Sequence, residues 1–280
     1  MGKTMSKTAK ITILGCGGSG GTPLATNYWG ACDPGEPKNR RTRASIAIRT
    51  ARTCVVIDSG PDFRTQTLRE NIENIDAVIY THPHGDHVNG IDDLRYVAIK
   101  QRRVQENDNI RVPIYADEHT LSDLKTRFHY MFNESPDGVY IPLIVAHEIK
   151  DYESVTINND LTLTSFVQIH GRGRSLGYRI GNVGYSTDTS DLDDKALNAL
   201  KGIDTWIVDC GQYGTDTKEL TVHANLELVL RWNKVIGASK IYLTHLTPRG
   251  DYATLNAETP DYIECAYDGL EIDVKLYPLT

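Results

Sequence analysis

Residues 81–87 read Thr-His-Pro-His-Gly-Asp-His, and this heptapeptide indicates more about the fold and function of the chain than any other stretch. It contains three of the nine histidines, His82, His84 and His87, together with Asp86. Imidazole nitrogens and carboxylate oxygens are ligands that suit Zn²⁺ and related ions. Groups packed this closely would be costly to bury without a partner. We therefore interpret the cluster as a metal-binding loop rather than a chance grouping of solvated side chains.

The position of this loop lets its ligands point in two directions. Residues 75–80 form a short apolar run that is typical of a buried strand, and Pro83 and Gly85 predict a turn directly after it. Alternate residues of extended backbone point the same way, so His82 and His84 share a side. Asp86 and His87 follow the turn and approach from another side.

The composition is that of an ordinary globular protein. The chain has 280 residues, a formal charge of −7 and a pI of about 5.7, and we expect a single domain over residues 1–280. The acidic balance argues against a protein that mainly tracks a nucleic-acid backbone and favours a small substrate.

Membrane insertion and secretion are not expected. No apolar run reaches the length of a membrane span, and residues 1–7 contain no apolar segment of the kind a secretory signal has. Five cysteines are scattered along the chain, odd in number and never as a C-x-x-C pair. This pattern predicts no disulfide framework and fits a reducing cytoplasm.

The expected secondary structure alternates strands and helices in each half of the chain, which predicts two sheets with helices outside them. The expected strands are 11–14, 45–50, 53–57, 75–80, 111–115, 161–169, 177–180, 183–186, 205–209 and 240–244, and the expected helices are 64–71, 92–100, 121–130, 192–200 and 225–236.

Three further candidate ligands each follow a predicted strand: His170, Asp188 and His245. Side chains at strand ends converge when the strands share one rim of a sheet. With the four residues of the heptapeptide they make seven potential ligands. Seven are too many for one tetrahedral ion and suit two ions that share a carboxylate.

This order of motifs resembles the metallo-β-lactamase fold superfamily: H-x-H-x-D-H at 82–87, then single ligands at 170, 188 and 245. The phosphodiesterase branch is the most similar, the branch that includes tRNA 3′-processing RNase Z and the phosphoribosyl cyclic phosphodiesterase of phosphonate metabolism. The resemblance extends to residues 14–23, 56–60, 177–180 and 243–246. It implies an α/β fold, an αββα sandwich of two mixed sheets lying face to face with helices on the outside.

The resemblance also implies a role for each site residue. His82, His84 and His170 would hold one divalent ion, Asp86, His87 and His245 would hold a second, either zinc or manganese, and Asp188 would bridge them. His223 would be a catalytic histidine that is not a ligand, and Asp58 would orient the metal loop. Two ions can share a hydroxide that attacks phosphorus in a small phosphate ester, with Asp86 counted among the catalytic residues. A homodimer is implied as well.

Other interpretations remain open for individual residues. His223 could simply hydrogen-bond the backbone at a helix N-terminus, and Asp188 could be a turn residue between two threonines. The glycine-rich segment 15–23 could cradle phosphate or allow close backbone packing. In the basic stretch 40–52 we select Arg43 as a candidate for substrate binding, although a solvated loop explains the same charges.

The chain departs from both named relatives, which leaves alternative functions. The phosphonate-pathway enzyme has closely spaced cysteines for a structural zinc after the glycine loop, whereas only Cys32 occurs here. The long tRNA-gripping arm of RNase Z has no counterpart, because residues 131–140 are short and acidic. The alternatives are a tRNA 3′-processing-like endoribonuclease, a thioester or lactone hydrolase on the same fold, and a metal-binding scaffold.

Overall fold

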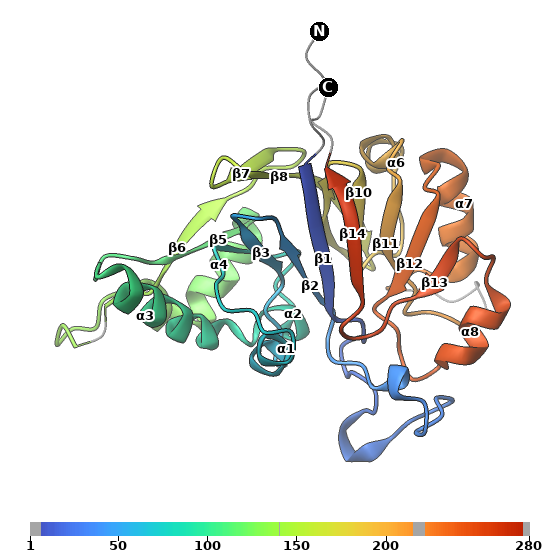
Figure 1. Ribbon diagram of the computed structural model, residues 1–280, viewed down its shortest axis with the longest axis horizontal. Coiled ribbons are helices and arrows are strands. Elements are labelled where there is room, and N and C mark those ends of the chain that lie inside the picture. Colours follow the sequence, from blue (N-terminus) through green and yellow to red (C-terminus); the bar gives the residue numbers. More distant parts are fainter. Residues whose placement is uncertain (1–6, 140, 215–221, 277–280) are drawn as a thin grey trace, which may run out of the picture.

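The computed structural model describes residues 7–139, 141–214 and 222–276, and within them two seven-stranded mixed sheets lie face to face (Figure 1). Across the first sheet the strands are, in order, β14 (Glu271–Leu276), β1 (Lys7–Gly15), β2 (Ser45–Arg49), β3 (Cys54–Ile57), β4 (Ala77–Ile79), β5 (Val112–Ala116) and β6 (Ile144–Glu148). Across the second sheet they are β13 (Ile263–Cys265), β12 (Lys240–Thr244), β11 (Thr205–Asp209), β10 (Val183–Ser186), β9 (Gly173–Ile180), β8 (Leu161–His170) and β7 (Ser154–Ile157).

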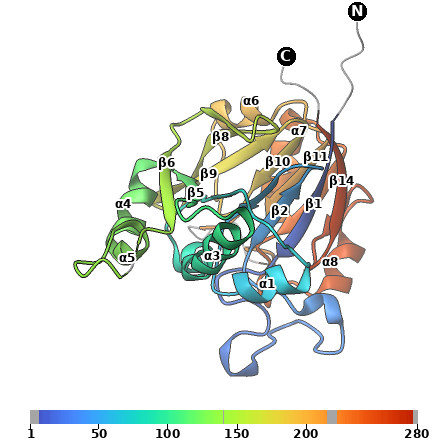
Figure 2. The ribbon, with the colours of Figure 1, turned by 60° about the vertical axis from the view of Figure 1, so that its left-hand side comes forward.

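Helices cover the outer face of each sheet (Figures 1 and 2). On the side of the first sheet they are α1 (Phe63–Arg69), α2 (Gly85–Val88), α3 (Leu94–Gln105), α4 (Glu118–Arg127) and α5 (His129–Phe132). On the side of the second sheet they are α6 (Asp194–Leu200), α7 (Leu226–Ile236) and α8 (Tyr252–Glu258). The three 3₁₀ turns are η1 (Ala25–Asn27), η2 (Pro37–Asn39) and η3 (Ile91–Asp93).

Three hydrophobic layers hold these elements together. Alternate residues of a strand point to opposite faces, and in β2 the side chains of Ile46 and Ile48 enter the layer between the sheets while Ala47 enters the layer under α1 and α3. A third layer lies between the second sheet and α6, α7 and α8. Strands buried on both faces read as continuous apolar runs, which explains the unbroken Val-Val-Ile of β3.

Parallel pairing brings the carboxyl ends of several strands to one rim. In the first sheet β3 pairs in parallel with β4, and in the second sheet β10, β11 and β12 are parallel neighbours. The segments that follow these strands carry residues 58, 81–87, 188 and 245, and residue 209 is the last residue of β11. The long connection between β1 and β2 lies at the same end of the molecule, below the sheets in Figure 1.

The connection between β1 and β2 is fixed by a buried guanidinium rather than by regular structure. Arg41 donates to the carbonyl oxygens of Gly250 (2.7 Å) and Thr247 (3.3 Å) and to the amide oxygen of Asn39 (3.0 Å). These bonds join the connection to the turn that follows β12. No strand or helix was expected between residues 15 and 44, and these bonds fix the position of this segment.

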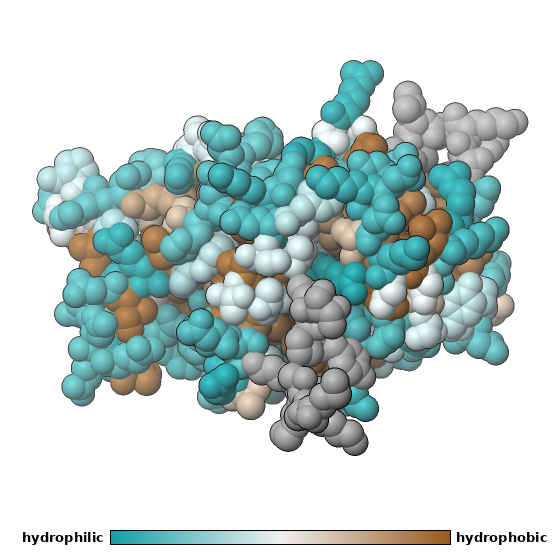
Figure 3. Space-filling model, turned by 90° about the horizontal axis from the view of Figure 1, so that it is seen from above, coloured by the Kyte–Doolittle hydropathy of each residue, from teal (hydrophilic) through white to brown (hydrophobic). Residues whose placement is uncertain are grey.

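None of the helices in the described part of the chain combines the length and apolarity that crossing a membrane requires. Seen from above, hydrophilic residues cover most of the face, and the hydrophobic residues are scattered in small groups (Figure 3).

The predicted αββα sandwich is confirmed, and most element boundaries agree within a few residues. Strands 183–186, 205–209 and 240–244 match their predicted bounds. The expected helix 121–130 divides at Phe128, which ends α4 and precedes α5. The sequence did not reveal the edge strands β6, β7, β13 and β14, because they are short or pack on one face only. Residues 1–6, which were expected to contain no secretory signal, lie outside the described residues.

The layer between the sheets is expected to supply much of the stability. Leu176 of β9 is fully buried in it, whereas Leu68 of α1 is 63% exposed. We expect Leu176→Ala to lower the free energy of unfolding by about 2–5 kcal/mol, and the matched Leu68→Ala to change it by less than about 0.5 kcal/mol. Urea unfolding followed by circular dichroism measures both. Equal effects of the two substitutions would contradict this assignment of the core.

Candidate metal centre

The histidine-rich loop leaves β4 at the shared rim and turns within four residues. His84 has extended backbone angles (φ −61°, ψ 147°), and the single helical turn α2 begins directly after it. Asp86 and His87 lie on this turn, whereas His82 and His84 precede it. The loop therefore presents two pairs of side chains to two neighbouring positions, as the turn residues predicted.

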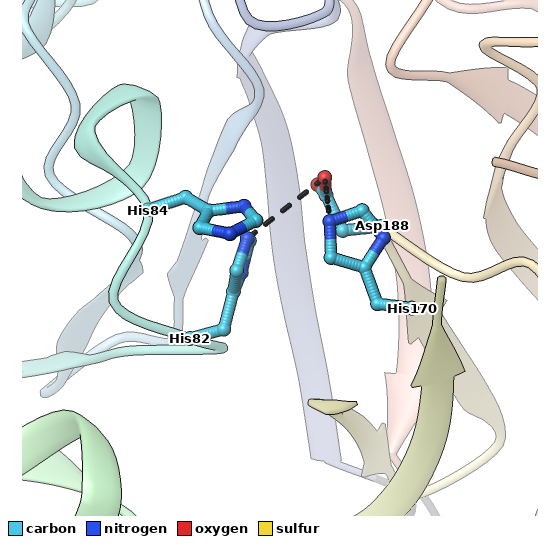
Figure 4. A group of neighbouring side chains, drawn as sticks. All are labelled: His82, His84, His170 and Asp188. Carbon is cyan, nitrogen blue, oxygen red and sulfur yellow. Dashed lines mark ion pairs between the residues drawn. The ribbon is translucent and has the colours of Figure 1, made fainter. Parts of the chain in front are cut away.

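The first position gathers His82, His84, His170 and Asp188, whose ligand atoms all lie within 4.8 Å of one another. Figure 4 shows the three imidazoles and the carboxylate converging from the metal loop, β8 and the segment after β10. The Oδ1 atom of Asp188 is 3.4 Å from Nε2 of His170 and 3.9 Å from Nε2 of His82. This is the set that the resemblance assigns to one ion, plus the bridging aspartate.

The second position gathers Asp86, His87, His245 and again Asp188. Here the other carboxylate oxygen of Asp188, Oδ2, lies 3.0 Å from Nε2 of His87 and 3.2 Å from Nε2 of His245. The Oδ2 atom of Asp86 lies 3.2 Å from Nε2 of His87. Asp188 thus gives one oxygen to each position, which is the arrangement a bridging ligand requires.

Burial and neighbouring charge shift the pKa values of these groups in different directions. Burial lowers the pKa of His87, but the carboxylates of Asp188 and Asp58 raise it well above its ordinary value. Burial raises the pKa of Asp188, but the imidazoles of His245, His87 and His82 outweigh this and hold it well below its ordinary value. Burial lowers the pKa of His82 well below normal and also lowers that of His170. An ionised carboxylate and neutral imidazoles are the ligand forms of these side chains.

The unused ring nitrogens supply an independent test of whether metal ions fit. The Nε2 atoms of His82, His87 and His245 are buried and have no hydrogen-bond partner. The opposite nitrogen of His87 donates to Asp58 Oδ2 at 2.7 Å, and that of His170 donates to the Val222 carbonyl at 2.7 Å. A ring that donates from Nδ1 presents a lone pair at Nε2. The two positions therefore fit one divalent ion each.

Asp58 holds the metal loop in place through hydrogen bonds. It follows β3, is fully buried, and accepts hydrogen bonds from the Thr81 amide (2.9 Å), the Thr81 hydroxyl (2.9 Å) and His87. One carboxylate thus fixes both the start of the loop and the ring of one candidate ligand. Its contacts are those expected of the residue that orients the loop.

Three of the site residues have backbone conformations that L-amino acids rarely adopt. Asp58, Asp188 and His245 have φ values of 65°, 51° and 55°. Such conformations cost about 1–3 kcal/mol each and persist where the surrounding structure enforces them. Each residue follows directly, or after one residue, the end of a strand, where the strained turn aims its side chain between the sheets.

The sequence assigned no role to Asp209, which the structure places beside His223. Asp209 ends β11 and is fully buried, and its Oδ2 accepts from His223 Nδ1 at 2.8 Å and from the Thr189 amide at 3.0 Å. Burial lowers the pKa of His223, but the Asp209 carboxylate raises it to about 9 overall. The available signal was an aspartate at a strand end on the same rim as Asp188.

His223 also lies next to the two metal positions. Its ring stacks on His245 with centroids 4.5 Å apart, and it lines a pocket of about 680 Å³ at the mouth of the site. By contrast, the side chains of His119, His129 and His147 are exposed and lie outside both positions.

Arg43 lies outside this group of residues. Its guanidinium is 3.2 Å from both carboxylate oxygens of Asp62, and its Nε donates to the Ser19 carbonyl at 3.3 Å. It is absent from the residues that line the 680 Å³ pocket. Arg43 supports the glycine-rich loop from behind, and its role in substrate binding stays a prediction.

Comparison with known proteins places the chain in a family. A beta-lactamase superfamily domain matches residues 53–246. The crystal structure of a diphosphatase from the PhnP family is 31% identical and superposes with a TM-score of 0.84, covering 97% of this chain and 99% of that one. Ribonuclease Z of Methanococcus maripaludis is 23% identical over 95% of this chain and 96% of its own length.

A further relative is considerably longer than this chain. An octanoyltransferase of Porphyromonas gingivalis is 32% identical over 95% of this chain but over only 52% of its own length. The chain therefore spans about half the length of that curated relative, and it also spans 50% of a beta-lactamase-like protein 2 homolog of Caenorhabditis elegans.

The fold and these similarities define the class of protein, a chain of the metallo-β-lactamase fold whose paired His/Asp positions could hold divalent metal ions. The chain belongs to the beta-lactamase superfamily.

The shared carboxylate makes metal content a direct test of the site. We expect Asp188→Ala to lower the bound divalent metal from two ions per chain to fewer than one, because both positions lose an oxygen and the imidazoles lose their counter-charge. Asp194→Ala, which changes an exposed aspartate in the first turn of α6, serves as the control. Elemental analysis of the purified proteins measures the ratio. Two ions retained by Asp188→Ala would refute the bridging role.

Proposed function

We propose that this chain is a dinuclear metal-dependent phosphodiesterase that hydrolyses a small cyclic or nucleotide-like phosphodiester. The observation that carries the proposal is the division of the two Asp188 oxygens between two groups of ligands. The similarity to a diphosphatase of the PhnP family over nearly the whole of both chains supports phosphate chemistry. The unpaired state of all five cysteines fits action in the cytoplasm.

In this proposal each of the two groups of neighbouring side chains binds one metal ion. His82, His84 and His170 would hold one ion, Asp86, His87 and His245 would hold the other, and Asp188 would contact both. Zn²⁺ or Mn²⁺ bound there would make water a nucleophile near neutral pH and would neutralise charge on the phosphoryl oxygens. The protein's own contribution is to fix these ligands through Asp58 and to keep bulk water out of the buried side of the site.

His223 is proposed to manage the proton of the leaving group. Asp209 holds its Nδ1, so Nε2 remains to carry a proton in the pocket. Water provides the oxygen that bonds to phosphorus, the P–O bond to the leaving group breaks, and the Nε2 proton passes to the leaving alkoxide oxygen. Asp209 acts through His223 by fixing the tautomer and the orientation of the ring.

A second candidate function is the hydrolysis of an acyl thioester or lactone on the same site. The observation in its favour is the octanoyltransferase relative, whose name refers to acyl chemistry. A tRNA 3′-processing activity has the ribonuclease Z similarity in its favour, while the net charge of −7 counts against it.

Steady-state assays separate these candidates. We expect the protein loaded with Mn²⁺ or Zn²⁺ to hydrolyse bis(p-nitrophenyl) phosphate clearly, with little turnover of p-nitrophenyl phosphate and none of an octanoyl thioester. The Asp86→Ala variant should lose the diester activity because one metal position loses its carboxylate. Thioester turnover with silent diesters would leave the metal site in place and reject the phosphodiesterase assignment.

The role of His223 predicts a loss of rate without a loss of metal. We expect His223→Ala to keep two ions per chain and to lose at least about 100-fold in kcat for a 2′,3′-cyclic nucleotide, because the leaving alkoxide has no proton donor. The exposed His119→Ala serves as the control. Metal loss from His223→Ala, seen by elemental analysis, would instead place His223 among the ligands.

A further inference from the structure

We propose that the pocket beside the metal centre binds the part of the substrate beyond the scissile phosphate, with Arg249 contacting a second anionic group and Tyr28 contacting a planar ring. The inference rests on the proposed function and narrows its substrate class to nucleotide-like esters that carry a second phosphate.

The pocket is larger than a phosphate group needs. Its volume is about 680 Å³, within the range of sites that hold whole small-molecule ligands. Its described walls are the glycine-rich loop, residues 24–31, the turn after β11, His223 and the turn after β12.

Two glycines show that the inner end of the pocket reaches the metal centre. A Cβ atom on Gly18 would lie 3.4 Å from the ring of His245, and one on Gly211 would lie 3.1 Å from Cγ of His223. Side chains at these positions would therefore press on two residues of the candidate site. When the phosphate of a substrate lies at the metal centre, the rest of the substrate therefore extends into the pocket.

Arg249 is an unpaired positive charge at this pocket. Its side chain is exposed and makes no hydrogen bond or ion pair with the residues that the structure describes. Arg41 and Arg43 nearby are both occupied, by loop oxygens and by Asp62 respectively. The residues that line the pocket include no aspartate or glutamate, so nothing in its described walls opposes the binding of an anion.

Tyr28 supplies an unused aromatic surface on the adjoining wall. It is 61% exposed, whereas its neighbour Trp29 is engaged by the Arg40 guanidinium 4.9 Å from its ring. The segment that carries Tyr28 is joined to the Arg249 turn, because the Ala31 amide donates to the Pro248 carbonyl at 2.8 Å. An exposed ring beside a free guanidinium is a suitable platform for a base next to a phosphate.

These features fit a nucleoside diphosphate ester better than a simple diester. A base would stack on Tyr28, one phosphate would contact Arg249, and the other would lie at the metal centre. Hydrolysis adds water across the P–O–P linkage: the P–O bond breaks, the water oxygen bonds to phosphorus, and a proton goes to the departing phosphate. A monophosphate ester with the same ring would leave Arg249 unused.

The test compares two nucleotide probes in the metal-loaded enzyme. ADP-ribose carries a base and a second phosphate, whereas the p-nitrophenyl ester of thymidine 5′-monophosphate carries a base alone. For Arg249→Gln we expect KM for ADP-ribose to rise about tenfold more than KM for the thymidine ester. A change of about tenfold is what the loss of one charge-assisted hydrogen bond produces. The control is Arg111→Gln, at an exposed arginine that precedes β5 and is absent from the pocket lining. We expect Tyr28→Ala to raise KM for both nucleotides, and Tyr28→Phe to restore it.

The outcomes distinguish this inference from the proposed function. Equal KM changes for the two probes in Arg249→Gln would overturn the subsite. Wild-type turnover of bis(p-nitrophenyl) phosphate without turnover of either nucleotide would also overturn it, while the phosphodiesterase assignment stands. Absence of all diester turnover would reject the proposed function and this inference together.

Discussion

The Asp188 carboxylate lies buried between two groups of imidazoles, and the arrangement of the rest of the site depends on it. One of its oxygens faces His82 and His170, and the other faces His87 and His245. A buried carboxylate is costly unless cationic groups balance it. The buried Nε2 atoms around it have no hydrogen-bond partner, so they too require a group to bind. Two divalent ions would satisfy both requirements at once.

The two-sheet sandwich brings the candidate ligands from both sheets close to one another. The first sheet contributes the loop after β4, and the second contributes β8 and the segments after β10 and β12. The packed layer between the sheets fixes their separation, so that ligands from both meet at the rim. Asp58 and Asp209 then set the orientation of His87 and His223. The strained backbone at Asp58, Asp188 and His245 is the cost of aiming side chains from strand ends into so small a space.

The sequence predicted those features that depend on local pattern. Apolar runs bounded by turns located β10, β11 and β12, and the H-x-H-x-D-H spacing located the metal loop. The single ligands at 170, 188 and 245 were recognisable by their order along the chain. The structure brings the seven residues together in the two groups that the resemblance implied.

Features that depend on tertiary contacts were not visible in the sequence. Nothing local distinguishes Asp209 from other strand-end aspartates, since its partner His223 lies 14 residues away. The same holds for Arg249 and Arg43. Only the three-dimensional structure shows that Arg43 is paired with Asp62, whereas Arg249 has no ion pair with the residues that the structure describes. The basic stretch around Arg43 drew attention by composition, whereas availability for a substrate is decided by which partners each guanidinium already has.

The most direct test of the central claim is anomalous diffraction from crystals of the protein loaded with Zn²⁺ or Mn²⁺. The account predicts two anomalous peaks per chain, about 3.5–4 Å apart, with one oxygen of Asp188 bound to each. A single peak, or two peaks of which only one contacts Asp188, would contradict the bridging role and with it the dinuclear centre.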